Sequence, residues 1–279
     1  MINTLLGGDQ LPWYDESLRI ELLKLATLLI EHAPDQLVEH RKELIKFAWN
    51  HLKSEDTQSK QCAYVNVCRF IQVYDTPPKI ILQVYVALLR TFQPDARALV
   101  KCAEGTELRN ELANSTAALV ATTFDAKFTV ANPALATQTR LQEAQLRFQG
   151  IVLVHTLVKR MPAWLPNQPD VLRKLTDIWL SAERKQRLTS EEQMPLEQIV
   201  ESKLLIKCFV SYCRHHASEG TMGSRQVELL FMMLSIFSEH TLVNYSFLKT
   251  FYLVEVAQEY TAEHKAECIK HLLLSLIHI

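Results

Sequence analysis

Residues 15–34 read DESLRIELLKLATLLIEHAP, and this stretch decides the fold class. Four leucines in it follow one another at steps of four, three and four residues, which places them on one face of an α-helix: Leu18, Leu22, Leu25 and Leu29. Asp15 can cap such a helix, and Pro34 prevents it from continuing. Because further apolar residues widen the stripe, we predict a helix from Glu16 to about His32 that is covered on two sides.

The same periodicity returns along the rest of the chain, separated by short breaks that contain proline or polar residues. Thr76 is the expected N-cap of the most apolar segment, with Pro77 at its first helical position. That segment is apolar nearly all round, so it should be buried within a stack. The predicted helices cover approximately residues 35–52, 59–74, 77–90, 94–103, 106–114, 115–124, 136–160, 170–185, 195–216, 225–239, 243–258 and 262–274.

Helix follows helix with no strand candidate, and pairs recur at roughly 40 residues, the spacing of HEAT and armadillo repeats. We therefore predict an all-α fold, an α-solenoid of antiparallel helix pairs. Composition agrees, since 279 residues with 48% hydrophobic side chains support a sizeable core. Six glycines and ten prolines are too few for the turns of an all-β protein, and no glycine-rich phosphate-binding loop occurs.

Charge and hydropathy exclude two further classes. Thirty basic against 31 acidic residues give a net charge of −1, so the chain lacks the basic footprint of a nucleic-acid-binding domain. No run of 18 apolar residues occurs, so no membrane partner is expected. The cysteines are scattered, mostly inside apolar segments, which indicates reduced thiols: Cys62, Cys68, Cys102, Cys208, Cys213 and Cys268.

The best metal candidate by residue type is the group Cys208, Cys213, His215 and His216. Its spacing does not fit a zinc site, which needs close pairs of ligands, and positions 208 and 213 share no helical face. Buried thiols and loop histidines are the preferred interpretation, as for Cys62 and Cys68, which are six residues apart. No catalytic motif occurs either, so we predict no catalytic, metal-binding or cofactor-binding residue and no cofactor.

The tryptophans and the short basic runs are expected to have structural rather than ligand-binding roles. Trp49, Trp164 and Trp179 lie at apolar helical positions or beside a bend, where packing is far more common than base stacking. The basic runs His40–Lys42 and Arg184–Arg187 are short, which is typical of a solvated face, with docking of a partner as the less favoured alternative.

Two parts of the chain resemble a known family. The first combines residues 17–34 with RKELIKFAW at 41–49 and PKIILQVYVALLR at 78–90. It strongly resembles the transformation/transcription domain-associated protein (TRRAP) family, including its fungal and plant counterparts. The second, looser part spans residues 140–181 and 203–249 and resembles another region of the same family.

The resemblance implies a segment of a very large pseudokinase of the phosphatidylinositol-3-kinase-related group, most of which is a HEAT-like solenoid. Such proteins are nuclear scaffold subunits of histone acetyltransferase complexes such as SAGA, where they receive transcription activators. The implied partners are the protein subunits of those complexes and the activators, with no direct contact to nucleic acid. The pseudokinase domain is not in this chain, so the resemblance transfers no catalytic residue.

The order of the two parts is the reverse of the order implied by the family. We therefore divide the chain into one helical-repeat block at residues 1–103 and a second at 104–273, meeting near Lys101–Gly105. Either the gene carries this order or the sequence joins two fragments, and the reading frame across codons 98–108 would decide. Residues 274–279 read LSLIHI, like a translated transposon-end sequencing adapter, and are expected to be a non-native tail.

Three functions remain open from the sequence. The first is a non-catalytic scaffold segment that binds protein partners through solenoid surfaces. The second is a helical enzyme, which the missing motifs disfavour. The third is a free-standing helical-repeat protein, unrelated to acetyltransferase complexes, that binds another protein or nucleic acid. A salt titration of DNA binding separates the first from a nucleic-acid binder, because phosphate contacts give a steep salt dependence.

Overall fold

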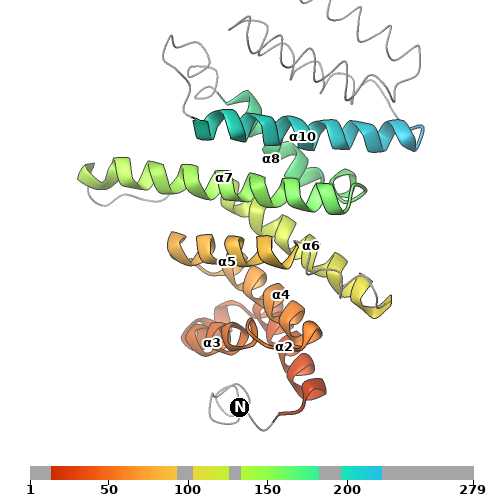
Figure 1. Cartoon of the computed structure of the whole chain (residues 1–279). Coiled ribbons are helices and arrows are strands. Elements are labelled where there is room, and N and C mark those ends of the chain that lie inside the picture. Colours follow the sequence, from red (N-terminus) through yellow and green to blue (C-terminus); the bar gives the residue numbers. More distant parts are fainter. Residues whose placement is uncertain (1–13, 93–102, 126–132, 182–195, 222–279) are drawn as a thin grey trace, which may run out of the picture. The chain divides into compact units, whose positions relative to one another are not determined.

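The computed structural model describes residues 14–92, 103–125, 133–181 and 196–221 (Figure 1). Every regular element in these ranges is a helix, so the predicted all-α class is confirmed. The chain divides into two compact units, Met1–Leu153 and Val154–Ile279. Within the described ranges, no helix is long and apolar enough to cross a membrane.

Helix α2, Glu16–His32, begins where the sequence predicts, because the Asp15 carboxylate accepts a hydrogen bond of 2.7 Å from the backbone N–H of Leu18. Its buried face is different from the predicted leucine stripe and consists of Leu22, Leu23, Ala26, Thr27 and Ile30. Leu18 and Leu25 are 44% and 43% exposed. In the described part of the chain, α2 is therefore covered on one side rather than on two.

The single helix predicted for residues 35–52 is two elements. A 3-10 helix, η2 at Asp35–His40, precedes α3, which runs from Arg41 to His51. The chain enters η2 through Pro34, whose carbonyl accepts the Leu37 N–H in the tighter i to i+3 pattern. Leu37 is buried by this turn, and α3 then buries its own apolar face: Leu44, Phe47 and Ala48.

Helix α4, Thr57–Val73, is the central element of unit 1. It packs against α2 and α3 on one side and against α6 on the other (Figure 1). Asp56 is its N-cap and accepts hydrogen bonds from the backbone N–H groups of Gln58 and Ser59 at 3.1 and 2.7 Å. The helix begins two residues before the predicted start, because Asp56 caps it within a polar stretch that carries no apolar periodicity.

Helix α5, Pro78–Thr91, shows that Thr76 was wrongly predicted as an N-cap. Pro77 occupies that position without a side-chain bond to the helix, and the Thr76 hydroxyl donates to the Tyr74 carbonyl instead. The helix is also less enclosed than predicted. Its buried side chains keep to one face, Ile81, Val84, Tyr85 and Leu88, while Val86 is 41% exposed.

Helix α6, Ala103–Phe124, replaces the two short helices predicted for this segment. The predicted boundary fell between Asn114 and Ser115, in a run of polar residues that often compete with helical hydrogen bonding. Here the Thr116 hydroxyl donates to the carbonyl of Leu112, four residues earlier, and Thr123 does the same to Leu119. Both threonines are buried, so these bonds satisfy their hydroxyls without interrupting the helix.

Helix α7, Ala136–Arg160, matches its predicted limits and follows a short 3-10 turn, η5 at Pro133–Leu135. Gly150 lies in the middle of α7 because the ring of Phe124 approaches closely: a Cβ added at this glycine would stand 2.5 Å from the Phe124 Cε1 atom. The glycine thus permits close packing of α7 on the end of α6 in unit 1.

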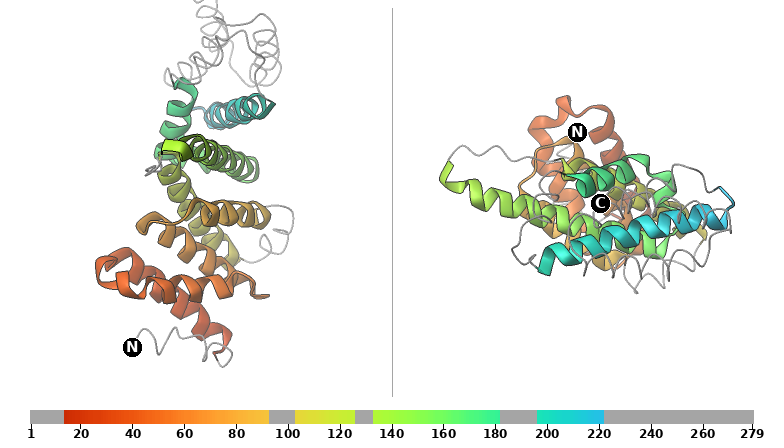
Figure 2. Two further views of the ribbon diagram at one scale, coloured as in Figure 1. Left: turned by 90° about the vertical axis from the view of Figure 1, so that its left-hand side faces the viewer. Right: turned by 90° about the horizontal axis from the view of Figure 1, so that it is seen from above.

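Unit 2 contains a 3-10 turn, η6 at Leu165–Asn167, followed by α8, Pro169–Leu180, and α10, Leu196–Ser218. Figure 2 shows α10 beside α8, and the two helices are in contact. Helix α8 ends at Leu180, five residues before its predicted end, where the chain becomes extended at Ser181. Several predicted features lie outside the described residues: most of the helix at 94–103, the loop at 183–193, the helices at 225–239, 243–258 and 262–274, and the tail at 274–279.

Candidate docking pocket in unit 1

The metal candidate does not assemble in the structure. Cys208 and Cys213 are fully buried in α10, whereas His215 and His216 lie partly exposed at its last turn. The His216 Nδ1 atom is 2.8 Å from the Thr221 hydroxyl. Burial raises the pKa of Cys208 to about 12, which keeps it a thiol. Among the described residues, no three of the types His, Cys, Asp and Glu form a group that could hold a metal ion.

Cys62 and Cys68 are buried thiols of α4, as predicted, and form no disulfide. Burial raises the pKa of Cys62 to about 11 and that of Cys68 to about 12. A protonated thiol is a poor nucleophile, so neither side chain is activated for catalysis. Cys102 and Cys268 lie outside the described residues.

The tryptophans also have the packing role that the sequence predicts. Trp164 and Trp179 are buried in unit 2, and the Trp179 ring meets the ring of Phe209 edge-on with centroids 6.2 Å apart. Trp49 is half-buried on α3. In the first basic run, Arg41 and Lys42 are exposed at the start of α3. The second run, Arg184–Arg187, lies outside the described residues.

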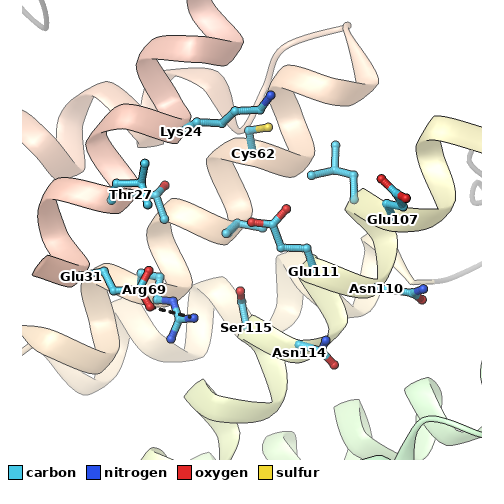
Figure 3. A pocket seen from close by; sticks show the side chains of 13 residues that line it. Lys24, Thr27, Glu31, Cys62, Arg69, Glu107, Asn110, Glu111, Asn114 and Ser115 are labelled. Carbon is cyan, nitrogen blue, oxygen red and sulfur yellow. Dashed lines mark ion pairs between the residues drawn. The ribbon is translucent and has the colours of Figure 1, made fainter.

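One concave feature of unit 1 is the α2–α4–α6 pocket, with a volume of about 670 Å³ (Figure 3). Three helices supply its lining. The list is Lys24, Thr27, Leu28 and Glu31 from α2; Cys62, Val65 and Arg69 from α4; and Glu107, Leu108, Asn110, Glu111, Asn114 and Ser115 from α6. Five of these thirteen residues are charged, so the pocket is polar.

Hydrogen bonds donated by side chains connect the three helices at this pocket. Asn66 of α4 donates from Nδ2 to the Thr27 hydroxyl of α2 at 3.0 Å, and that hydroxyl donates to the Leu23 carbonyl at 2.8 Å. On the other side of α4, Gln72 donates from Nε2 to the backbone carbonyl of Ser115 at 2.9 Å. Thr27, Asn66 and Ser115 are buried, so these bonds satisfy polar groups that water does not reach.

Both cations of the pocket lie beside carboxylates. Lys24 Nζ is 2.9 Å from Glu21 Oε1, and Arg69 Nη2 is 3.5 Å from Glu31 Oε1. The hydrogen bond with Glu21, and at longer range the charge of Glu111, raise the pKa of Lys24. Both pairs are partly exposed, so each stabilises the fold only slightly.

The two acidic residues of α6 differ from Glu21 and Glu31, each of which lies beside a cation. Glu107 and Glu111 are exposed and one helical turn apart, and the Glu111 carboxylate extends into the pocket toward α2 and α4 (Figure 3). Neither forms an ion pair within 4 Å in the described part of the chain. Two unneutralised carboxylates therefore give the pocket a negative side. The lining has no histidine and only protonated Cys62 as a thiol, so its chemistry suits binding.

Sequence reasoning did not identify this pocket. Glu107 and Glu111 four residues apart, with Leu108 between them, are a weak signal that many solvated helices share. The pocket also needs α2, α4 and α6, whose residues are up to about 90 positions apart, to lie side by side. No pattern within one helix reveals that arrangement.

Comparison with known proteins gives a match over almost the whole chain. The family described as the Tra1 HEAT repeat ring region matches residues 3–104 and, separately, residues 102–278. No solved structure matches the chain. The helical structure and the family match together confirm the predicted HEAT-like solenoid class.

Similar proteins come from several eukaryotes. The chain is 60% identical over 88 residues to "Probable transcription-associated protein 1" of Dictyostelium discoideum, covering 32% of this chain and 2% of that protein. It is 44% identical over 99 residues to "SAGA complex/NuA4 acetyltransferase complex subunit TRA1" of Saccharomyces cerevisiae, covering 36% and 3%. The human "Transformation/transcription domain-associated protein" is 30% identical over 127 residues, covering 46% and 3%.

The aligned segments are a small part of each curated relative, 2 to 4% of its length. The resemblance predicted from residues 17–34, 41–49 and 78–90 is nevertheless confirmed, because the family match includes all three stretches. The chain therefore belongs to the Tra1 HEAT repeat ring family.

Proposed function

We propose that this chain is a non-catalytic scaffold segment of a transcription coactivator complex of the histone acetyltransferase class, and that it acts in the nucleus. The observation that carries the proposal is the family match over residues 3–104 and 102–278. Two of the relatives are named as subunits of the SAGA and NuA4 acetyltransferase complexes. The partners proposed for this chain are accordingly the protein subunits of such a complex.

The architecture of unit 1 supports a scaffold role. Its helices form a stack held by buried apolar side chains, and α2 leaves three leucines exposed: Leu18, Leu25 and Leu28. Helical repeats of this type bind partners through such extended surfaces, where a few buried anchor residues supply most of the affinity. The described part of the chain offers no activated nucleophile or metal cluster that would suggest catalysis instead.

The test is purification of the full-length gene product, tagged at its own locus. We expect histone acetyltransferase subunits in the eluate and acetylation of nucleosomes by it. An eluate free of both would overturn the proposal and favour a free-standing helical-repeat protein. Localisation follows from the same tagged strain, in which we expect a nuclear signal.

We further propose that this segment helps to recruit transcription activators to chromatin. Support comes from the relatives' printed names, which refer to transcription, and from the solenoid surfaces described above. Surface-immobilised activator segments should retain the 279-residue chain. An equal retention of the chain by scrambled segments of the same composition would contradict specific recruitment.

We also propose that residues 1–103 and 104–273 represent two separate blocks of the family's solenoid and that residues 274–279 are a non-native tail. The two family matches meet at residues 102–104, which supports the proposed division. Sequencing the gene across codons 98–108 and 270–279 tests both points. An uninterrupted frame that continues with other codons after residue 273 would establish the tail as foreign and the block order as native.

A further inference from the structure

The α2–α4–α6 pocket carries a charge pattern that selects an occupant. Lys24 and Arg69 already lie beside Glu21 and Glu31, while Glu107 and Glu111 have no ion pair in the described residues. We propose that this pocket docks a short helical segment of a partner protein that presents lysine or arginine side chains to Glu107 and Glu111. The inference names a partner class for the proposed scaffold function and rests on it.

The spacing of the two acids favours a helical partner. Glu107 and Glu111 are four residues apart on α6, so their backbone positions lie about one turn apart on the same helical face, and both residues line the pocket. Two basic residues three or four positions apart on a helix present charges at the same interval. Guanidinium groups suit this site particularly well, because they donate two hydrogen bonds to a carboxylate in a fixed geometry.

Three apolar residues line the same pocket as the acids. Leu28 of α2 is 52% exposed, Leu108 of α6 is half-buried and Val65 of α4 is buried. An incoming segment therefore needs an apolar residue on the same face as its basic ones. The combination describes an amphipathic basic helix, a common form of docking segment.

The size and lining disfavour an apolar small molecule. Pockets for such ligands are lined mostly by hydrophobic and aromatic side chains, whereas this lining contains no aromatic residue and only three large apolar ones: Leu28, Val65 and Leu108. A volume of about 670 Å³ accommodates a few inserted side chains rather than a whole helix. The pocket would thus receive the contacting side chains, while the partner helix lies along its rim.

One structural condition must hold. The negative side of the pocket comes from α6, which Gln72 fastens to α4 through the Ser115 carbonyl. Helix α6 begins at Ala103, beside the junction of the two proposed blocks. The gene must therefore encode α5 and α6 in one continuous frame, and a break between codons 98 and 108 would overturn the proposal.

The binding experiment uses the complete 279-residue chain and two labelled 16-residue peptides. Both place leucine on one helical face, and one carries lysine where the other carries glutamate. Fluorescence anisotropy should show binding of the lysine peptide, weakening as salt rises from 50 to 300 mM, and much weaker binding of the glutamate peptide. Equal binding of the two peptides would overturn the charge argument.

Variants locate the site. Glu107→Lys/Glu111→Lys should weaken binding of the lysine peptide by at least about tenfold, and Glu107→Gln/Glu111→Gln should weaken it less, since it removes the charge without reversing it. The matched control is Glu39→Lys/Glu55→Lys, which makes the same charge change at exposed positions outside the pocket. Circular dichroism verifies that all variants stay helical.

The outcomes separate this inference from the scaffold proposal. If the Glu107→Lys/Glu111→Lys variant binds like the control variant, the pocket is not the docking site, even where the tagged full-length protein still copurifies with acetyltransferase subunits. If copurification fails while the lysine peptide binds as described, the scaffold proposal falls and the pocket remains a binding site for a basic helix.

Discussion

Helices α2 and α4 are both 17 residues long, and both begin after an aspartate N-cap, yet their environments differ. The leucine-rich α2 buries five residues, whereas α4 buries eleven, including the polar side chains of Ser59, Gln61 and Asn66. Helix α4 has α2 and α3 on one side and α6 on the other (Figure 1). Burial therefore follows the place of a helix in the stack more closely than its own hydrophobicity.

The comparison also explains how each helix is stabilised. Helix α2 contributes one apolar face and leaves Leu18, Leu25 and Leu28 accessible to another surface. Helix α4 is connected to its neighbours by specific side-chain hydrogen bonds as well as by apolar contacts: Asn66 to Thr27 and Gln72 to the Ser115 carbonyl. A leucine lost from α2 and a polar group lost from α4 should thus have different consequences.

The largest expected effect is on the buried face of α2. Leu23 is completely buried, so Leu23→Ala should lower the free energy of unfolding by about 2–5 kcal/mol through the cavity that it leaves. Leu25, two residues away and 43% exposed, is the matched control, and Leu25→Ala should change stability by only about 0.5 kcal/mol. Urea unfolding followed by circular dichroism measures both values. Equal losses would mean that α2 is covered on both faces.

The polar connection between the two helices should have the next largest effect. Asn66→Ala removes the donor to Thr27 from a fully buried site and should cost about 1–3 kcal/mol. Thr27→Val completes a double-mutant cycle, since it removes the acceptor with little change in shape. A coupling energy near zero would show that Asn66 stabilises α4 without this bond.

The difference in burial between α2 and α4 shows which structural features could be predicted from the sequence and which could not. Periodicity and capping residues define the ends of α2 and α7 almost to the residue, because those signals are local. They do not say which of several apolar faces is covered: of the four leucines in the predicted stripe, Leu18 and Leu25 are exposed, whereas Leu22 is buried and Leu29 half-buried. The covered face depends on α4, which is distant in the sequence.

The same reasoning applies to α6 and the pocket. The sequence predicts two helices that meet between Asn114 and Ser115, but burial of this segment and the bond from the Thr116 hydroxyl to the backbone keep α6 continuous. Glu107 and Glu111 become part of a candidate binding site only because α6 lies across the pocket from α2. Packing between distant segments decided each of these features.

Removing the N-cap aspartates of α2 and α4 tests whether the two caps stabilise the fold to a similar extent. Asp56→Ala should cost about 1 kcal/mol, because the N–H groups of Gln58 and Ser59 lose their acceptor. Asp15→Ala removes the single bond to Leu18 and is the natural comparison. Although burial acts to raise it, the hydrogen bonds from the backbone N–H groups of Ser59 and Gln58 help to hold the pKa of Asp56 below its ordinary value.

Because the pKa of Asp56 is lowered in the folded chain, its contribution to the free energy of unfolding depends on pH. A carboxyl with a lowered pKa stabilises the fold above its unfolded pKa of about 3.9, and this contribution disappears as the pH falls through the lower, folded pKa. The difference in unfolding midpoint between the native chain and Asp56→Ala should therefore shrink on acidification below about pH 4. A difference that is the same at pH 7 and pH 2.5 would exclude an ionised cap.

The smallest effect concerns the first turn of α2, where Glu16 lies beside Asp56 at the start of α4. The hydrogen bond with Asp56, then the repulsion of its charge, raise the pKa of Glu16. A group with a raised pKa stabilises the fold below its unfolded pKa of about 4.3, and that contribution is lost as the pH rises through the higher, folded pKa. Glu16→Gln keeps the uncharged form at all pH values, so this variant should be more stable than the native chain at pH 7 and equal to it near pH 3. The exposed Glu39→Gln is the control, and thermal unfolding at the two pH values gives the comparison. If Glu16→Gln is no more stable than the native chain at pH 7, the charges at the two helix starts do not repel each other.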